Sequence, residues 1–154
     1  MKTTLTSAAQ STVLRAFGEE LHLHLTSEQT DGRFALFTEL TPPGGGPPPH
    51  WHDREDECFH VLEGTVSFFA DGRWVDAGPG DTVLAPRGQV HTFRNNTDRT
   101  TRMLIQATPG GFEKFFGAAA EEFARPGGPD MARAVQIAKD HGIHFAAPDG
   151  TRAS

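Results

Sequence analysis

The sequence of 154 residues contains a single cysteine, Cys58, and no long run of apolar residues. One cysteine excludes a framework of disulfide bonds within the chain. A membrane-spanning helix needs about 20 consecutive apolar residues, so we predict no membrane segment. The first twelve residues are small and polar and lack the apolar stretch of a signal peptide. We therefore expect a cytoplasmic protein.

Positive charge is also scarce. The chain has 14 lysines and arginines against 20 aspartates and glutamates, a net charge of −6, and no cluster of basic residues. A basic patch is the usual mark of a nucleic-acid-binding protein, so we predict no nucleic-acid partner. A globular chain of this length buries roughly 70% of its unfolded surface. It therefore needs neither a disulfide nor a metal merely to fold.

The most informative residues are two histidines one residue apart, His50 and His52. Side chains at positions i and i+2 of a β-strand point to the same face, so both can approach one point. Glu57 can reach that point from the next strand, and His91 from a strand folded back alongside. Imidazole and carboxylate ligands suit Fe, Ni, Mn, Co, Cu or Zn. We predict one divalent transition metal held by His50, His52, Glu57 and His91.

Two longer motifs contain these four residues. The first, G-x5-H-x-H-x4-E-x6-G, begins at Gly44 and ends at Gly64. The second, G-x5-P-x-G-x2-H-x3-N, begins at Gly80 and ends at Asn95. Both resemble the two signature motifs of the cupin superfamily, and residues 65–79 between them match the short spacer of small single-domain cupins. The resemblance implies a jelly-roll fold that carries a metal.

The local sequence is most similar to small bacterial quercetin 2,3-dioxygenase-like cupins. The similarity rests on residues 44–49 before the histidine pair, on residues 54–64, and on residues 111–113 and 141–143 of the tail. It implies a metal with three histidines and one glutamate, flavonol or related enol substrates, and dioxygen insertion with ring cleavage. It also implies a homodimer that pairs through the N-terminal strand region. Phe59 departs from the family, where a hydroxylated aromatic is common.

The rest of the chain predicts an all-β protein with two short C-terminal helices. Alternating apolar and polar residues indicate strands at residues 21–25, 34–40, 57–62, 65–70, 73–76, 82–85, 91–94 and 102–107. The Asp-Gly pairs at Asp31 and Asp71 indicate hairpins. Many short strands of this kind are typical of a jelly-roll β-barrel, the double-stranded β-helix of cupins. Helical spacing appears over residues 111–124 and 130–140.

These elements suggest four segments along the chain. We expect a flexible N-terminal arm at 1–12, a cupin β-barrel at 13–110, a helical segment packing on the barrel at 111–145, and a tail at 146–154. Asp130 is the expected N-cap of the second helix. The packing side of that helix is expected to contain Met131, Val135, Ile137 and Ala138.

Strand parity also predicts the lining of a substrate pocket. Phe59 and Val61 share the parity of Glu57, and Phe93 follows His91. The full expected set is Phe59, Val61, Phe68, Phe93, Met103 and Ile105. Cys58, as a small buried residue, and His60 have the opposite parity and should face away. The remaining histidines are expected at solvent-facing strand positions (His22, His24) or at a helix end (His141, His144). Residues 53–56 are expected to form a solvated turn.

Several functions are compatible with such a site. The leading hypothesis is a metal-dependent dioxygenase that acts on a flavonol-like or other enolisable aromatic substrate, with Glu57 as both ligand and general base. The second is a non-redox metal cupin, either an aromatic polyketide cyclase or an isomerase, in which the metal only polarises carbonyl groups. The third is a cupin that binds a small molecule without turnover.

Overall fold

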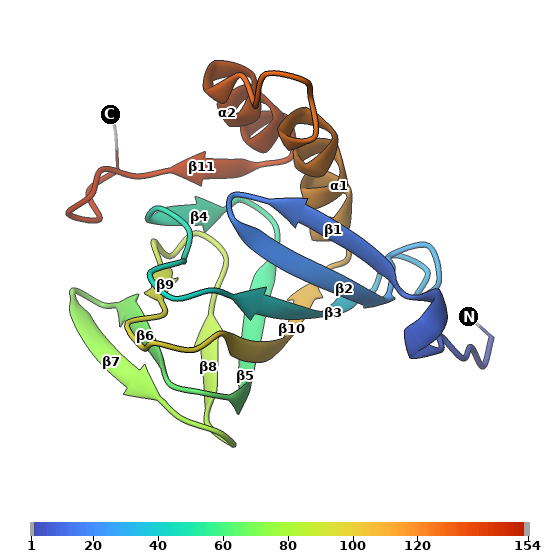
Figure 1. Ribbon diagram of the computed structural model, residues 1–154, viewed down its shortest axis with the longest axis horizontal. Coiled ribbons are helices and arrows are strands. Elements are labelled where there is room, and N and C mark those ends of the chain that lie inside the picture. Colours follow the sequence, from blue (N-terminus) through green and yellow to red (C-terminus); the bar gives the residue numbers. More distant parts are fainter. Residues whose placement is uncertain (1, 153–154) are drawn as a thin grey trace.

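The computed structural model describes residues 2–152, in which two layers of antiparallel strands carry two helices at one end (Figure 1). The larger layer is a six-stranded sheet. Its strands, in spatial order, are β1 (Thr12–Ala16), β2 (Glu19–Leu25), β3 (Ala35–Thr41), β10 (Thr101–Thr108), β5 (Asp56–Glu63) and β8 (Thr82–Ala85). The expected all-β cupin architecture is confirmed by this arrangement and by the relatives described below.

The opposite layer is assembled from two smaller sheets. One has the order β7 (Arg73–Ala77), β6 (Val66–Ala70) and β9 (Thr92–Arg94), and the other pairs β11 (Ile143–Phe145) with β4 (His50–His52). A single antiparallel bridge joins His50 of β4 to His91, which directly precedes β9. The five strands therefore form one layer. The two bridged residues, His50 and His91, are both predicted metal ligands.

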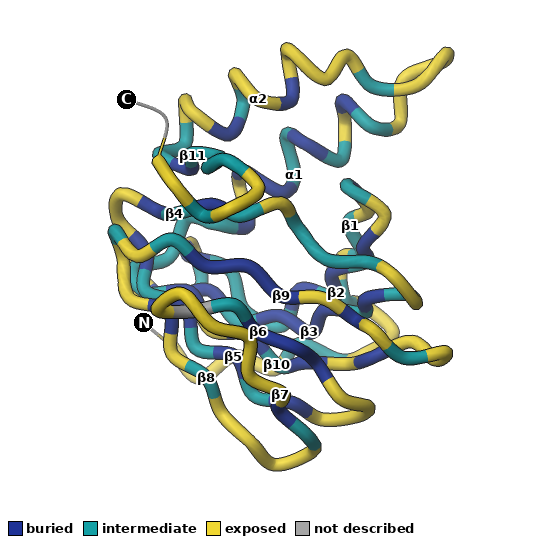
Figure 2. Tube along the Cα trace, turned by 90° about the vertical axis from the view of Figure 1, so that its left-hand side faces the viewer, coloured by how far each residue is buried: buried dark blue, intermediate teal, exposed yellow. Residues whose placement is uncertain are grey.

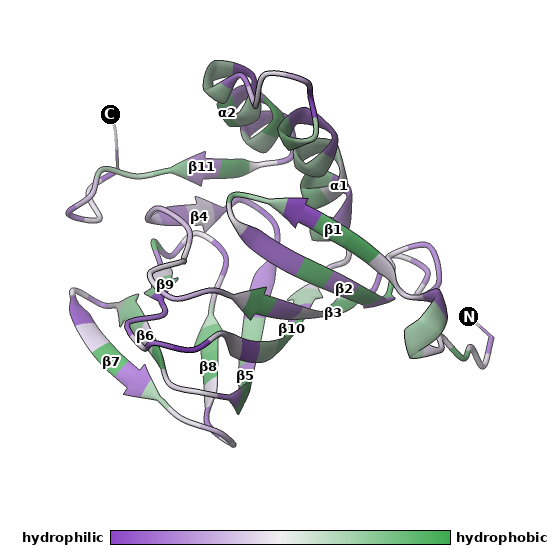
Figure 3. Ribbon diagram, viewed as in Figure 1, coloured by the Kyte–Doolittle hydropathy of each residue, from purple (hydrophilic) through white to green (hydrophobic). Residues whose placement is uncertain are grey.

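The apolar core lies between the two layers. Alternate residues of β5 and β10 are buried, as a sheet with one packed face requires, and Figure 3 shows the same alternation of hydropathy along β2. Phe59 of β5 contacts Phe68 and Phe93 of the other layer, with ring centroids 5.3 and 5.8 Å apart. In Figure 2 the buried segments concentrate in the strands, while loops and the outer turns of α2 are exposed.

Positive backbone φ angles mark the tight turns. Asp31–Gly32 and Asp71–Gly72 both have positive φ, and the two predicted hairpins are confirmed. A third hairpin, not predicted, joins β1 to β2 through Phe17 (φ 54°) and Gly18 (φ 81°). A bulky residue with positive φ is uncommon. This turn directs the Phe17 ring against the first helix.

The N-terminal region contains two elements that the sequence pattern did not indicate, and the flexible arm at residues 1–12 stays a prediction. A short 3₁₀ helix, η1 (Ala8–Gln10), precedes β1, a strand that the hydrophobic pattern does not reveal because its inward alternation is incomplete. Since β2 lies between β1 and β3, both of its edges are already paired. A second copy of the chain could therefore not extend the sheet by pairing with β2. The edge strand on that side of the sheet is β1. The homodimer itself stays a prediction.

The two helices differ in how well the sequence predicted their packing. In α1 (Phe112–Phe123) the predicted apolar face is buried at Phe115, Phe116 and Ala119. In α2 (Met131–Asp140) the predicted packing side is correct at Ala138, which is buried, and at Ile137, which is partly buried against the core. It is wrong at Met131 and Val135, which are about half exposed. The buried positions are Ala134 and Ala138, whose small side chains lie one turn apart.

The start of α2 agrees with the prediction. Asp130 is its N-cap, and the side chain accepts hydrogen bonds from the backbone N–H groups of Ala132 and Arg133. No helix among residues 2–152 is long and apolar enough to span a membrane.

Asn95, the last residue of the second motif, fastens the loop that leads to His50. Its side chain is fully buried and donates to the backbone oxygens of Thr41 (2.9 Å) and Arg99 (2.7 Å). Its backbone oxygen accepts from the N–H of Gly44, and its own N–H donates to Gly45. These bonds attach the glycine- and proline-rich loop to the end of β9.

We predict that Asn95→Ala lowers the free energy of unfolding by about 2–4 kcal/mol, because it removes the two hydrogen bonds that the side chain donates and the two that it accepts from Thr97. Chemical denaturation at neutral pH measures the effect. Asn96→Ala is the matched control, since Asn96 is exposed, and it should change stability by less than about 0.5 kcal/mol. Equal effects of the two variants would contradict the role given to Asn95.

Candidate metal centre

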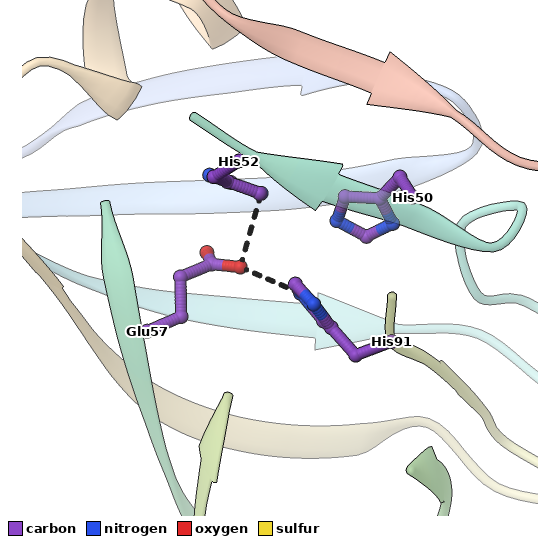
Figure 4. Close-up of side chains that lie close together, drawn as sticks. All are labelled: His50, His52, Glu57 and His91. Atoms are coloured by element: carbon purple, nitrogen blue, oxygen red, sulfur yellow. Dashed lines mark hydrogen bonds and ion pairs between the residues drawn. The ribbon is translucent and has the colours of Figure 1, made fainter. Parts of the chain in front are cut away.

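Four buried side chains converge between the two layers. His50 and His52 project from β4, Glu57 from β5, and His91 from the residue before β9 (Figure 4). Each is at most 7% exposed. One ligand atom from each residue lies within 4.8 Å of the others. The structure thus brings together all four residues predicted as metal ligands.

Main-chain contacts hold the histidines in register. His50 and His91 exchange two backbone hydrogen bonds of 3.0 and 2.9 Å, and the Gly88 N–H donates to the His52 oxygen at 2.8 Å. Gly46 lies so close to β9 that a Cβ added to it would be 2.1 Å from the Phe93 oxygen, and its φ is +137°. Only glycine fits there, which explains why the loop before His50 can pass so near the site.

Backbone carbonyls determine how two of the imidazoles are oriented. His50 Nδ1 lies 2.9 Å from the Pro48 oxygen, and His91 Nδ1 lies 3.0 Å from the Gln89 oxygen. A carbonyl oxygen only accepts, so both Nδ1 atoms must carry the proton. In the neutral rings this leaves the Nε2 lone pairs free for a metal.

The contacts around Glu57 test whether these residues suit a cation. Its Oε2 lies 3.0 Å from His91 Nε2 and 3.2 Å from His52 Nε2. Among the described residues, neither ring nitrogen of His52 has a hydrogen-bond partner. Lone pairs of neutral imidazoles facing a carboxylate oxygen repel each other unless a cation or extra protons lie between them. The donor set therefore fits a transition metal.

Glu55 is a further part of the site that the sequence did not reveal. The expectation of a solvated turn over residues 53–56 is wrong for this residue, which is 2% exposed. Its Oε2 lies 3.7 Å from His52 Nδ1. A carboxylate behind a ligating histidine orients the ring and makes it more basic. Glu55 differs here from exposed Asp53 and Arg54 because it points inward.

The electrostatics of the cluster prepare it for a cation. Burial, with repulsion from His91 and His52, lowers the pKa of His50 to about 3, so His50 is neutral. Burial acts to raise the pKa of Glu57, but in the metal-free protein the attraction of protonated His52 and the hydrogen bond that a protonated His91 donates outweigh it and bring the pKa to about 2. The pKa of His52 is raised: burial opposes this, and the carboxylates of Glu57 and Glu55 cause it.

Two comparisons identify the family. The family model described as Cupin domain matches residues 37–106. The oxalate-binding protein of Thermotoga maritima is 32% identical over 83 residues, which are 52% of this chain and 68% of that protein. The chain belongs to the cupin superfamily. The predicted family is therefore confirmed, and all four clustered side chains lie within the matched residues.

The similarities to individual cupins point to more than one chemistry. Quercetin 2,3-dioxygenase of Bacillus subtilis (strain 168) is 31% identical over 107 residues, 69% of this chain and 32% of that enzyme. The chain spans less than half the length of the first curated relatives it matches. The structure of the polyketide cyclase RemF from Streptomyces resistomycificus aligns with a TM-score of 0.59 at 26% identity, covering 70% of this chain and 80% of that one.

Beside the four side chains this cupin has a narrow, aromatic cavity of about 40 Å³. His50 and Glu57 form part of its wall, and six phenylalanines form most of the rest: Phe17, Phe93, Phe112, Phe115, Phe116 and Phe145. The Phe112 ring, at the start of α1, stacks on His52 with centroids 5.5 Å apart. The first helix thus closes the site.

The predicted pocket residues are placed differently from expectation. Of the six, all within the described chain, only Phe93 lines this cavity. Phe59, Val61, Phe68, Met103 and Ile105 pack in the apolar core. Strand parity correctly predicted that these side chains face inward. They fill the barrel interior below the candidate metal centre and do not line the cavity beside it. Helix α1 and the β1–β2 turn supply most of the aromatic wall instead. The local sequence pattern does not predict that either of them lies next to the cavity.

Two glutamates in the cavity wall were also missed. Glu19 (6% exposed) and Glu39 (4% exposed) come from β2 and β3. Strand parity could have found them, because Glu19 alternates in phase with Leu21 and Glu39 with Phe37. Burial, assisted by the negative charge of Glu57, raises the pKa of Glu19 to about 8. Burial, with repulsion from Glu19, raises the pKa of Glu39 well above its usual range.

The other histidines lie away from the centre, as predicted, but not all where expected. His60 faces outward and contacts Thr82. His24 is partly buried rather than solvent-facing, with its Nε2 2.6 Å from Thr38 Oγ1. His144 belongs to β11, not to a helix end, and pairs with Asp53 at 2.7 Å. Cys58 has the predicted outward parity but is partly exposed.

Glu19 and Glu39 make stability depend on pH. Because both carboxyls titrate higher in the folded chain than the value of about 4.3 in an unfolded one, the unfolded state loses these protons first as pH rises. The free energy of unfolding of the metal-free protein should therefore fall between about pH 4.5 and pH 8, by up to about 1.4 kcal/mol per pH unit per group. Denaturation at a series of pH values measures it.

The matched variants isolate this contribution. Glu19→Gln and Glu39→Gln should each flatten the decline, while Glu28→Gln, at an exposed loop position, should leave it unchanged. A decline of the same slope in all three variants and the wild type would show that other groups cause it.

Proposed function

We propose that this cupin is a metal-dependent enzyme whose divalent transition metal is held by His50, His52, Glu57 and His91. The observation that carries the proposal is the convergence of three imidazoles and one carboxylate in a buried centre, with ligand atoms within 4.8 Å of one another and two of the imidazoles against one carboxylate oxygen. A bound transition metal supplies a Lewis acid and, with four protein ligands, one or two open coordination positions. Fe, Ni, Mn, Co, Cu and Zn all suit the donor set.

The reaction that we infer is dioxygenation of a flavonol-like or other enolisable aromatic substrate. The similarity to a quercetin 2,3-dioxygenase over 69% of the chain supports it, and so does the phenylalanine-lined wall of the cavity, whose apolar rings suit contact with an aromatic substrate. Glu57 accepts the proton of the substrate's enol hydroxyl. A bound metal would acidify the enol hydroxyl and so ease this transfer. Dioxygen is the oxidant, and both of its atoms enter the products.

A second candidate is a cyclase that acts on an aromatic polyketide without oxidation. The structural similarity to the polyketide cyclase RemF favours it. In that case the same four side chains hold the metal, and the aromatic wall positions the folded chain of the substrate. The two candidates share the centre and differ in whether oxygen is consumed.

The ligand assignment predicts a loss of metal in two variants. His50→Ala and His91→Ala should each lose most of the bound metal and keep the fold, because the core strands do not depend on either side chain. Elemental analysis after purification and circular dichroism measure both properties. His60→Ala, on the outward face of β5, is the control and should retain the wild-type metal content. Full occupancy in either of the first two variants would refute the assignment.

The dioxygenase proposal predicts oxygen uptake. Protein reconstituted with Fe²⁺, Ni²⁺ or Co²⁺ should consume oxygen in step with the loss of flavonol absorbance, and metal-free protein should not. Glu57→Gln should slow this rate by about 100-fold or more, the usual contribution of a general base. If none of the three metal forms takes up oxygen with any flavonol, the dioxygenase proposal is wrong and the cyclase is tested next.

A further inference from the structure

The cavity contains two carboxyl groups that the proposed metal chemistry does not use. Glu19 and Glu39 lie on the adjacent strands β2 and β3. In the register Glu39 faces Leu21, so Glu19, two residues before Leu21, is its diagonal neighbour on the same inward face. Both line the cavity that His50 and Glu57 line. Among the described residues, no hydrogen bond or ion pair joins either glutamate to the four metal-ligand candidates.

One carboxyl oxygen of Glu19 has no hydrogen-bond partner among the described residues. Its Oε1 is buried and has no hydrogen bond within residues 2–152, while the side chain is more than nine-tenths buried. The Glu39 carboxyl accepts one hydrogen bond, from Thr41 Oγ1 at 3.1 Å. An unpaired buried carboxyl oxygen costs free energy that a ligand group can recover. Since Glu19 faces a cavity, that group belongs to whatever the cavity binds.

The surroundings favour the neutral, hydrogen-bond-donating form of both groups. The nearby wall is aromatic, and no lysine or arginine of the described residues lines the cavity. In the metal-free protein, burial and repulsion from Glu57 raise the pKa of Glu19 to about 8, and burial and repulsion from Glu19 raise that of Glu39. A protonated carboxyl has an O–H donor as well as an acceptor. The pair is therefore suited to an uncharged oxygen rather than to a cation.

We propose that Glu19 and Glu39 form a second anchor for the substrate, donating hydrogen bonds to an oxygen remote from the metal-binding end of an aromatic molecule. The inference rests on the proposed function, because the metal is the first anchor. The ligand class is then a planar aromatic with two oxygen functions, one at each end. A substrate held at both ends enters in one orientation only, so the pair determines specificity.

The size of the cavity adds a condition. About 40 Å³ accommodates roughly three water molecules, so an aromatic ring requires the side chains of the covering helix to move apart. Phe112 and Phe115, at the start of α1, are side chains of this helix that line the cavity and would have to move. The two polar anchors lie on strands instead, so they keep their places when α1 shifts.

Binding of matched probes tests the second anchor. The probes are 3-hydroxyflavone, which has only the metal-binding oxygens, and a set of its derivatives with one additional hydroxyl on either ring system. Nickel-loaded protein is titrated under anaerobic conditions, and flavonol absorbance gives the dissociation constants. We expect at least one derivative to bind the wild type about tenfold more tightly than 3-hydroxyflavone.

Three variants separate the roles. The double variant Glu19→Leu, Glu39→Leu should bind that derivative and 3-hydroxyflavone equally, and it should fold, because it replaces buried carboxyls with apolar groups of similar size. The double variant Glu19→Gln, Glu39→Gln keeps a neutral donor at each position and should retain the tenfold preference. Glu20→Gln is the control on the outward face of β2 and should match the wild type.

Each contrary result has its own meaning. Equal binding of all probes by the wild type, or a preference that survives in the leucine variant, would overturn the inference alone. A preference lost in the glutamine variant would indicate charged carboxylates that hold a cation, which also overturns it. If nickel-loaded wild type fails to bind 3-hydroxyflavone itself, the proposed function falls, and the second anchor with it.

An infrared spectrum of the metal-free protein supplies a readout that needs no ligand. At pH 7 the wild type should show the C=O stretching band of a protonated carboxyl, and the glutamine variant should lack it. Absence of this band from the wild type would overturn the donor role of the pair, whatever the probes bind.

Discussion

The two backbone hydrogen bonds between His50 and His91 are the contact on which both the fold and the site depend. They join the β4–β11 pair to the three strands of the other small sheet, and so complete the second layer. The same two residues offer their side chains to the candidate metal. Glu57 comes from the opposite layer, so a metal held by all four residues would cross-link the layers. The contact that completes the second layer therefore also brings two of the candidate ligands together.

One cavity contains carboxyl groups in two opposite electrostatic states. Glu57 is ionised because His52 and His91 lie against it, which outweighs its complete burial. Glu19 has no such partner, and burial holds it in the neutral form up to about pH 8. Neighbouring titratable groups whose pKa values are driven apart are typical of functional sites. The difference divides the cavity into an end that attracts a cation and an end that donates hydrogen bonds.

Much of the centre could be predicted from local rules, and the reasons for the failures are specific. The i, i+2 rule placed His50 and His52 on one face, and the motif spacing supplied Glu57 and His91. Glu55 was missed because its neighbours Asp53 and Arg54 are exposed, and turn composition does not show which of several polar side chains points inward. Strand parity shows that Glu19 and Glu39 face inward, but it does not show that they lie near the site, because β2, β3 and the Phe17 turn approach it only when the barrel closes.

The sequence by itself determined the family, the all-β class, the hairpins at Asp31 and Asp71, and the four side chains of the centre, because periodicity, turn chemistry and motif spacing act over short distances. Only the tertiary structure decided that α1 and the β1–β2 turn form part of the cavity wall, and that β11 pairs with β4. It also decided that the carboxyl groups of Glu19 and Glu39 face the same space as the candidate metal ligands. Those outcomes depend on contacts between distant segments, and on burial, which no local pattern contains.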